Sequence, residues 1–346
     1  MSKCNISVII PCYNREKTIV RCIDSIAKQL DANDRIIVID DCSTDKTIDI
    51  VNSNFGSDNR IIVVQNEKNM GVSTARNNGI KIVETELMIF IDSDDYIKDG
   101  YLKTIREQFA KEKMEMLVSG LTYVDEVSGL KKEVLPDVNK LEKLDLPNKI
   151  MTLDIQELLA SSCNKVYLTK IINTNNICFN KEARMMEDYE FNLNYLKHVN
   201  NIKILENSWY NYIHHGNDSA SSKYHSDLYE RYKEIKNIRE GFYSKELCSQ
   251  TLKLNLDFLL LCINNLYKEN SLTNKQRRIV LEEIINTKEF SYWKKHIKKS
   301  GVLERIICFS TITNNVFISD SMLYMLHRIK KNSKTINKLF RKMNKK

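Results

Sequence analysis

The chain has 346 residues, of which 42% are hydrophobic and 28% charged, the balance of a soluble globular protein with room for two domains. Its 3 prolines and 9 glycines exclude long linkers and low-complexity segments. The net charge of +8 is unevenly placed, because residues 290–346 carry 14 Lys/Arg against 2 Asp/Glu and leave a net of −4 for residues 1–289.

The cysteines and the hydropathy of the chain argue against a disulfide-rich, zinc-binding, secreted or membrane-spanning protein. The 9 cysteines are odd in number and form no Cys-x-x-Cys pair, so neither a disulfide framework nor a zinc site is indicated. The N-terminus lacks the apolar stretch of a signal peptide. The longest later apolar run, Phe258–Ile263, is far shorter than the ~20 residues of a membrane span. We therefore expect a cytoplasmic protein with reduced thiols that does not cross a bilayer.

The first 120 residues alternate short apolar runs with helical patterns. Strands are predicted at residues 6–10, 35–40, 61–65, 87–92 and 116–119, and helices at 16–29, 44–53, 72–84 and 99–112. The apolar runs lack strict alternation, which indicates parallel strands buried on both faces. This order predicts a doubly wound α/β layer, whose ligands bind beyond the carboxyl ends of the strands.

The remaining chain is interpreted in three stretches. Residues 121–150 are read as an irregular, charged excursion, and residues 151–215 return to helix and strand patterns. From about residue 225 onward the pattern is helical, with Leu252, Leu256 and Leu259 on one helix face.

Polar segments follow three of the predicted strands, at residues 11–14, 41–45 and 92–95. The last of them, Asp92-Ser93-Asp94-Asp95, places three carboxylates within four residues, which is costly unless a cation or hydrogen-bond donors compensate. Oxygen ligands of this kind suit Mg²⁺ or Mn²⁺, and either ion can bridge a diphosphate. The alternatives are a solvated acidic turn or a helix N-cap.

Four motifs in this order carry a resemblance to a known family. They are Ile6–Asn14, Arg35–Thr47, Asn69–Gly79 and the acidic segment Asp92–Asp95. Residues 4–225 resemble family 2 glycosyltransferases, which have the GT-A fold. The resemblance implies a GT-A-like doubly wound mixed sheet, with a nucleotide-sugar half at 1–120 and an acceptor half at 121–225. Residues 226–346 are then a helical C-terminal region with a basic tail.

The resemblance also implies donor contacts. Tyr13 would stack on uracil, Asp41 would accept the uracil N3–H, Arg76 would approach the diphosphate or base, and Asp92 would contact the ribose or sugar. The further implied nucleotide-sugar contacts are Pro11, Asn14, Asn69 and Ser93. The implied ligands of Mn²⁺ or Mg²⁺ are Asp94, Asp95 and His215, which lies in the segment Trp209–Ser219.

The segment Arg184–Phe191 resembles the Glu-Asp motif of the family. The resemblance assigns Asp188 as the general base that removes the acceptor proton, with Glu187 orienting the site. The residue-level alternative is an acidic first helical turn favoured by the helix dipole. Asn164 and Lys165, from a segment that often precedes this motif, would support the floor of the site.

The predicted activity is inverting transfer of a hexosyl or N-acetylhexosaminyl group from a UDP-sugar. The acceptor implied is a hydroxyl of a surface polysaccharide, a teichoic-acid-like polymer or a lipid-linked oligosaccharide. Two alternatives stay open: a catalytically inactive GT-A-like scaffold, and a basic-tail nucleic-acid-binding protein, although no reader motif is present and no nucleic-acid partner is expected.

The C-terminal segment suggests a docking role. After Asp320 there are nine Lys/Arg and no acidic residue. Two apolar sets recur there at helical spacing, namely Met322, Leu323, Met325, Leu326 and Ile329, then Ile336, Leu339, Phe340 and Met343. An amphipathic helix of this kind fits either peripheral contact with the inner membrane face or packing on protein, including a homo-oligomer.

Overall fold

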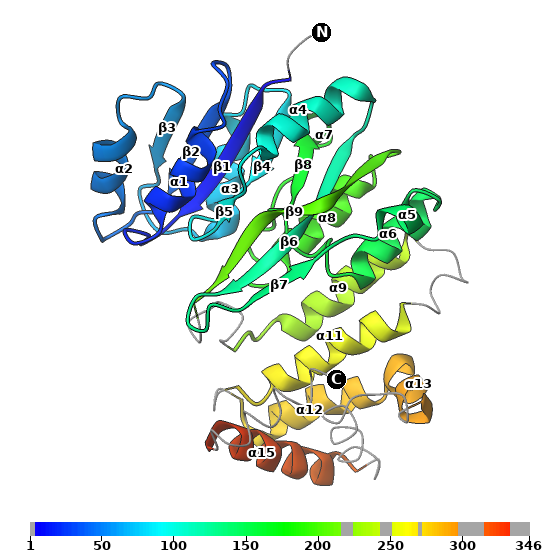
Figure 1. Ribbon diagram of the computed structural model, residues 1–346. Helices are drawn as coiled ribbons and strands as arrows, with labels where there is room; N and C mark the ends of the chain where they lie inside the picture. Colours follow the sequence, from blue (N-terminus) through cyan, green and yellow to red (C-terminus); the bar gives the residue numbers. More distant parts are fainter. Residues whose placement is uncertain (1–3, 216–223, 243–250, 269–271, 297–314, 333–346) are drawn as a thin grey trace. The chain divides into compact units, whose positions relative to one another are not determined.

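A computed structural model describes residues 4–215, 224–242, 251–268, 272–296 and 315–332 (Figure 1). The chain divides into two compact units, residues 1–217 with 241–243, and residues 218–240 with 244–346. The first unit is an α/β structure and the second is helical.

The N-terminal part of the first unit follows the predicted order of strands and helices. The strands are β1 (Ile6–Cys12), β2 (Arg35–Asp40), β3 (Ile61–Gln65) and β4 (Leu87–Phe90), and the helices between them are α1 (Ile19–Ala27), α2 (Thr47–Phe55) and α3 (Val72–Lys81). The strands pair in parallel in the order β3-β2-β1-β4. Strands β1 and β4 are buried along their whole length, as their unbroken apolar runs predict.

Helix α3 lies very close to the sheet. A Cβ atom built at Gly79 would sit 2.5 Å from Cγ2 of Ile9 in β1, so only glycine permits this approach. Ala75, one turn earlier, is also small and buried. The close packing carries Arg76, which an exposed helix would present to solvent, into the interior at 3% exposure.

The C-terminal part of the unit turns the sheet into a mixed one. Its elements are β5 (Tyr96–Ile97), α4 (Tyr101–Lys111), β6 (Met116–Asp125), β7 (Lys131–Val134), α5 (Val138–Leu141), α6 (Leu146–Ile155), β8 (Lys165–Leu168), α7 (Thr169–Thr174), α8 (Glu187–Leu196) and β9 (Ile202–His214). The nine-stranded sheet has the order β3-β2-β1-β4-β8-β6-β9-β5, with β7 paired to β6. Strand β8 is antiparallel to both neighbours, whereas β6 and β9 are parallel.

The interpretation of residues 121–150 as an irregular excursion is wrong. Strand β6 continues to Asp125 and forms a hairpin with β7, and α5 and the first half of α6 follow (Figure 1). The hairpin requires glycine at 120, because a Cβ there would lie 2.7 Å from the carbonyl oxygen of Val134. Strand β7 reads Lys-Lys-Glu-Val and is largely exposed, so it lacks the apolar run by which a strand is recognised.

The second unit contains the helices α9 (Leu228–Glu240), α11 (Leu252–Asn265), α12 (Asn274–Ile285), α13 (Lys288–His296) and α15 (Val316–Asn332). Helix α11 packs against α9 and α13, and α12 packs against α15. The buried Asp320 fixes α15, because it accepts hydrogen bonds from Arg277 Nε at 2.6 Å and Arg278 Nε at 2.9 Å. None of the helices in the described ranges is both long and apolar enough to cross a membrane.

Candidate active site

The acidic segment joins β4 to β5 and is held by strand β9. Tyr210 of β9 accepts a hydrogen bond from the backbone N–H of Asp92 at 3.2 Å, and its hydroxyl donates to Asp95. The other Asp95 oxygen accepts the backbone N–H of Ile213 at 2.7 Å. Burial and the nearby Asp92 and Asp94 raise the pKa of Asp95, which is 1% exposed. Asp95 therefore anchors this loop to β9, and its expected contact with the metal stays a prediction.

Asp94 lies on the accessible side of the same segment, with 24% of its side chain exposed. Its Oδ2 is 3.5 Å from a guanidinium nitrogen of Arg15 and 3.7 Å from Nε2 of His215. Burial and Asp92 raise the pKa of Asp94, while Arg15 opposes the shift. Ser93, by contrast, is buried, and its carbonyl accepts from the hydroxyl of Thr18 at 3.0 Å.

Two loops at the carboxyl ends of β1 and β2 are tied together. Asn14, at a positive φ of 52°, accepts the backbone N–H of Thr44 at 2.8 Å and donates its own N–H to Ser43 Oγ at 2.9 Å. Pro11 is buried within β1 opposite Ile39. Tyr13, which lies between Pro11 and Asn14 in the sequence, is 41% exposed, so its ring is available for stacking. Ligand contacts of Pro11 and Asn14 stay predictions, and the contacts described here are structural.

Asp41 organises the loop that leads into α3. Its carboxylate accepts backbone N–H groups of Met70 at 2.9 Å and Gly71 at 2.7 Å, and the amide of Asn66 at 2.9 Å. The side chain is 3% exposed. Asn69 lies in this loop with its surface exposed. The predicted acceptance of uracil N3–H by Asp41 would therefore add to an existing set of bonds that shapes the loop.

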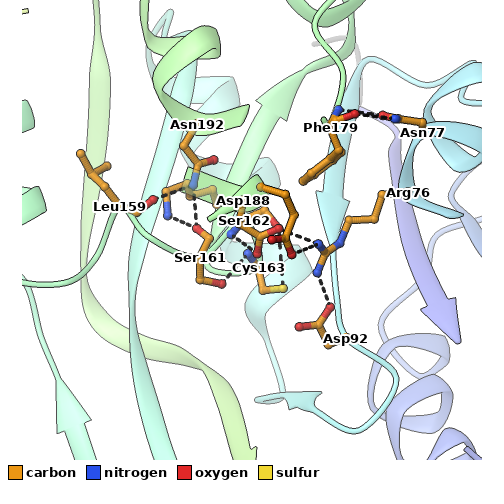
Figure 2. A network of polar contacts seen from close by, with 12 residues as sticks. Arg76, Asn77, Asp92, Leu159, Ser161, Ser162, Cys163, Phe179, Asp188 and Asn192 are labelled. Carbon is orange, nitrogen blue, oxygen red and sulfur yellow. Dashed lines mark hydrogen bonds and ion pairs between the residues drawn. The ribbon is translucent and has the colours of Figure 1, made fainter. Parts of the chain in front are cut away.

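Arg76 joins the two halves of the unit (Figure 2). Its guanidinium donates to Asp92 at 2.8 Å and to Asp188 at 2.6 Å, and it lies 3.7 Å from a Glu187 oxygen. The guanidinium also lies over the Phe179 ring, 5.2 Å from the centroid. Burial disfavours the charged form, but Asp188 and Asp92 outweigh it and raise the pKa of Arg76. Arg76 thus bridges carboxylates of the two halves, and its expected contact with the diphosphate or base stays a prediction.

Asp188 and Glu187 occupy the first turn of α8, where the helix dipole favours negative charge. The helix follows Met186, whose φ of 64° is strained for a non-glycine residue. Burial raises the pKa of Asp188, and Arg76 partly reverses the effect. Burial and Asp188 raise the pKa of Glu187 to about 7. The pKa values of both carboxyls thus lie above their ordinary range.

A buried network forms the floor beneath Asp188 (Figure 2). The N–H of Ser162 donates to Oδ2 of Asp188 at 3.3 Å, and Asn192 donates to the carbonyls of Leu159 at 2.6 Å and Ser161 at 3.0 Å. Lys165 is fully buried and donates to the Leu158 carbonyl at 2.6 Å.

Lys165 also donates to Oδ1 of its neighbour Asn164 at 2.7 Å, and burial lowers the pKa of Lys165 to about 7. The expectation that Asn164 and Lys165 support the floor agrees with these contacts.

Three residues that lie near Asp94 were not predicted from the sequence. Arg15 and Arg21 come from the β1–α1 region, and Glu126 comes from the β6–β7 turn. Arg21 donates to the carbonyl of Asp94 at 2.8 Å, and Glu126 lies 2.6 Å from Nδ1 of His215. The position of Arg15 directly after Asn14 is a signal that could have been used. Nothing in the sequence marks Glu126.

The side chains around Asp94 offer a partial set of ligands for a divalent cation. Across the described ranges, no group of three or more His, Cys, Asp or Glu side chains could hold a metal ion. Asp94 and His215 together offer one carboxylate and one imidazole. Such a pair fits the mode in which Mg²⁺ or Mn²⁺ takes one or two protein ligands and completes its coordination with substrate phosphates and water.

Comparisons with known proteins agree on one family. Residues 7–174 match the sequence model of glycosyl transferase family 2. The uncharacterized glycosyltransferase EpsJ of Bacillus subtilis strain 168 is 25% identical over 242 residues, which cover 69% of this chain and 70% of that protein. The poly(ribitol-phosphate) beta-N-acetylglucosaminyltransferase TarS of Staphylococcus aureus is 32% identical over 233 residues, covering 65% of this chain but 38% of TarS.

A solved structure extends the likeness beyond the first unit. The crystal structure of S. aureus TarS 1-349 in complex with UDP-GlcNAc matches with a TM-score of 0.63 at 24% identity, covering 94% of this chain and 91% of that one. This likeness supports the fold, and the family match covers the strands that carry the acidic segment. Residues 7–174 therefore belong to glycosyl transferase family 2, and the chain is a glycosyltransferase with a GT-A fold.

Proposed function

We propose that this glycosyltransferase moves a hexosyl or N-acetylhexosaminyl group from a UDP-sugar to an acceptor hydroxyl in one inverting displacement. The observation that carries the proposal is the bridge made by Arg76 between Asp92 and Asp188. It places the acidic segment of the donor side beside the Glu-Asp pair of the acceptor side. A sugar held at Asp92 would then lie within reach of a hydroxyl held at Asp188.

The reaction needs one bond formed and one broken. The acceptor oxygen attacks the anomeric carbon, the bond from that carbon to the UDP phosphate oxygen breaks, and UDP leaves. Asp188 takes the hydroxyl proton as general base, and its Oδ2 stays fixed by Ser162 N–H. Arg76 holds Asp92 and Asp188 in place through both contacts. Because the attack is direct, neither a serine nor a cysteine nucleophile is needed.

Asp94 and His215 would hold the divalent cation, with Arg15 adding positive charge 3.5 Å from Asp94. When bound, Mn²⁺ or Mg²⁺ would neutralise the negative charge that develops on the departing diphosphate. Tyr13, through its exposed ring, and Asp41 would receive the base at the other end of the nucleotide.

We expect UDP binding to depend on the cation and on Asp94. Chelating Mn²⁺ with EDTA, or replacing Asp94 by alanine, should each weaken UDP binding by ~10–100-fold, because the diphosphate loses its bridging partner. Calorimetric titrations of UDP with Mn²⁺ and with EDTA measure both effects. Asp99→Ala, which removes an exposed carboxylate just beyond β5, is the matched control. Equal affinity in all of these titrations would remove the metal role.

The pH dependence of the rate should show an acid limb. Asp188 must be ionised to accept a proton, and burial raises its pKa, while the pKa of its neighbour Glu187 is raised to about 7. The rate should therefore fall as the pH drops through the raised pKa of Asp188 and level off above it. The apparent pKa values of the Glu187–Asp188 pair are obtained from the pH dependence of kcat/KM for UDP-sugar hydrolysis, which is measured as the release of UDP. A rate that begins to fall only near the ordinary aspartate pKa of about 4 would contradict a base whose pKa is raised by burial.

The acceptor is proposed from chemistry and likeness together. TarS acts on poly(ribitol-phosphate), according to its name. This favours a teichoic-acid-like polymer over a surface polysaccharide or lipid-linked oligosaccharide as the source of the hydroxyl. The inactive-scaffold alternative is disfavoured by the intact Asp188–Arg76–Asp92 cluster.

Docking through the C-terminal helices stays a prediction. Of the expected apolar set in α15, Leu323 is buried within its own unit and Met325 is 68% exposed. The second set, residues 336–343, lies outside the described residues, as does most of the basic tail.

A further inference from the structure

The tip of the β6–β7 hairpin brings Glu126 beside His215. Asp125, the last residue of β6, pairs in parallel register with His214, the last residue of β9. The pairing continues one step, since the N–H of Glu126 donates to the His214 carbonyl at 3.1 Å. Gly129, at φ 68°, closes the turn by donating to the Asp125 carbonyl at 2.8 Å. Glu126 and His215 therefore leave two adjacent strands at the same level.

The contact between these two side chains determines which imidazole nitrogen carries the proton. Nδ1 of His215 lies 2.6 Å from Oε2 of Glu126, and Nε2 lies 3.7 Å from Oδ2 of Asp94. An ionised carboxylate can only accept, so Nδ1 must donate. In the neutral ring, Nε2 then presents its lone pair towards Asp94.

Arg21 fixes this arrangement from the other side. One guanidinium nitrogen is 3.4 Å from Oε1 of Glu126, and another donates to the carbonyl of Asp94 at 2.8 Å. The guanidinium lies 5.3 Å from the centroid of the Tyr96 ring. The hairpin tip is thus linked to the acidic segment by Arg21 as well as by His215.

We propose that Glu126 is a positioning residue that orients His215 so that its Nε2 faces the cation site at Asp94. This inference rests on the proposed function, because it assumes that Asp94 and His215 hold the cation. A carboxylate on the far nitrogen fixes the tautomer and ring orientation of a metal-binding histidine and makes the ring a stronger ligand. The hairpin, which lies outside the motifs of the family resemblance, would then complete the donor site.

Mn²⁺ binding to the full-length protein saturated with UDP tests the proposal without measuring turnover. Glu126→Ala should weaken Mn²⁺ binding by ~10–100-fold, the usual effect of losing such a partner. Glu126→Gln should stay within about threefold of wild type, because its amide oxygen still accepts the Nδ1 proton. Glu133→Ala removes another carboxylate of the same hairpin, one paired with Lys98, and should leave Mn²⁺ binding unchanged. Calorimetry and the electron paramagnetic resonance signal of free Mn²⁺ give the affinities.

A double-mutant cycle shows whether Glu126 acts by orienting His215 or only through its contact with Arg21. If Glu126 acts through His215, Glu126→Ala should have no further effect in a His215→Ala background. An equal loss in both backgrounds, or wild-type Mn²⁺ affinity in Glu126→Ala while His215→Ala is impaired, would overturn the inference and leave the proposed function standing. Unchanged Mn²⁺ affinity in both Asp94→Ala and His215→Ala would instead remove the proposed cation site, and the inference with it.

Discussion

Replacing Asp188 by asparagine should reduce transfer by ~10²–10⁴-fold, the range expected for loss of a general base. Asparagine keeps the shape of the side chain and an oxygen for the Ser162 N–H, which donates to Asp188 at 3.3 Å. It cannot take the acceptor proton. The loss should therefore appear in kcat, and donor affinity should change little. Hydrolysis of UDP-GlcNAc and UDP-glucose gives the rate, and calorimetric titration of the same donors gives the affinity.

Glu190→Gln is the matched control for this experiment. It removes a carboxylate from the same first turn of α8, so it reproduces the loss of charge at the helix N-terminus. We expect it to retain wild-type turnover. If Asp188→Asn also turned over at the wild-type rate, the base would have to be sought elsewhere. Glu187, whose pKa is raised to about 7, would be the next carboxylate to replace.

The N-terminal part of the sheet was predictable because its signals are local. Strands β2 and β3 have the predicted bounds, and the helix predicted at 72–84 corresponds to α3 at Val72–Lys81. Each strand is a short apolar run followed by a polar turn, which a single sequence displays. The acidic segment lies directly beyond β4, at the carboxyl end where ligands of such sheets bind.

The acceptor part was less predictable because its strands depend on partners far away in sequence. Strand β5 has two residues, Tyr96 and Ile97, and exists through pairing with β9 more than 110 residues later. Strand β7 is exposed and charged. Neither shows the periodicity from which strands are inferred. The position of Glu126 beside His215 follows from their pairing and was hidden for the same reason.

The contacts of Arg76 show what packing adds to a motif. Its place in Asn69–Gly79 suggested a side chain turned to the diphosphate or base. Gly79 lets α3 approach β1, which buries Arg76 where carboxylates distant in sequence converge. Asp188 is 112 residues away. A local sequence pattern cannot show that residues so far apart in the chain are in contact. The sequence did single out Arg76, Asp92 and Asp188 individually.

Replacing Arg76 by glutamine should have the largest combined effect on stability and rate. Asp92, Asp188 and Glu187 would lose the guanidinium that contacts all three, and burial would leave their charges uncompensated. Removing one partner of a buried ion pair costs about 3 kcal/mol or more, and the partial exposure of these carboxylates favours the lower end. Trp209, stacked on Tyr101, reports unfolding of the catalytic unit by fluorescence when Trp293 is replaced by phenylalanine.

The pH dependence of the rate and of the stability of Arg76→Gln distinguishes the loss of this guanidinium from a general weakening of the fold. Burial already raises the pKa of Asp188, and Arg76 opposes that rise. Without Arg76 the pKa of Asp188 should rise further, so the acid limb of the rate should move to higher pH. The stability deficit relative to wild type should shrink as the pH falls through this pKa, because a protonated carboxyl no longer needs a cation. Arg76→Lys keeps the charge but cannot span both carboxylates, and it should leave the acid limb near its wild-type position at a lower rate. An acid limb unmoved in Arg76→Gln would show that Arg76 does not set the ionisation of the base.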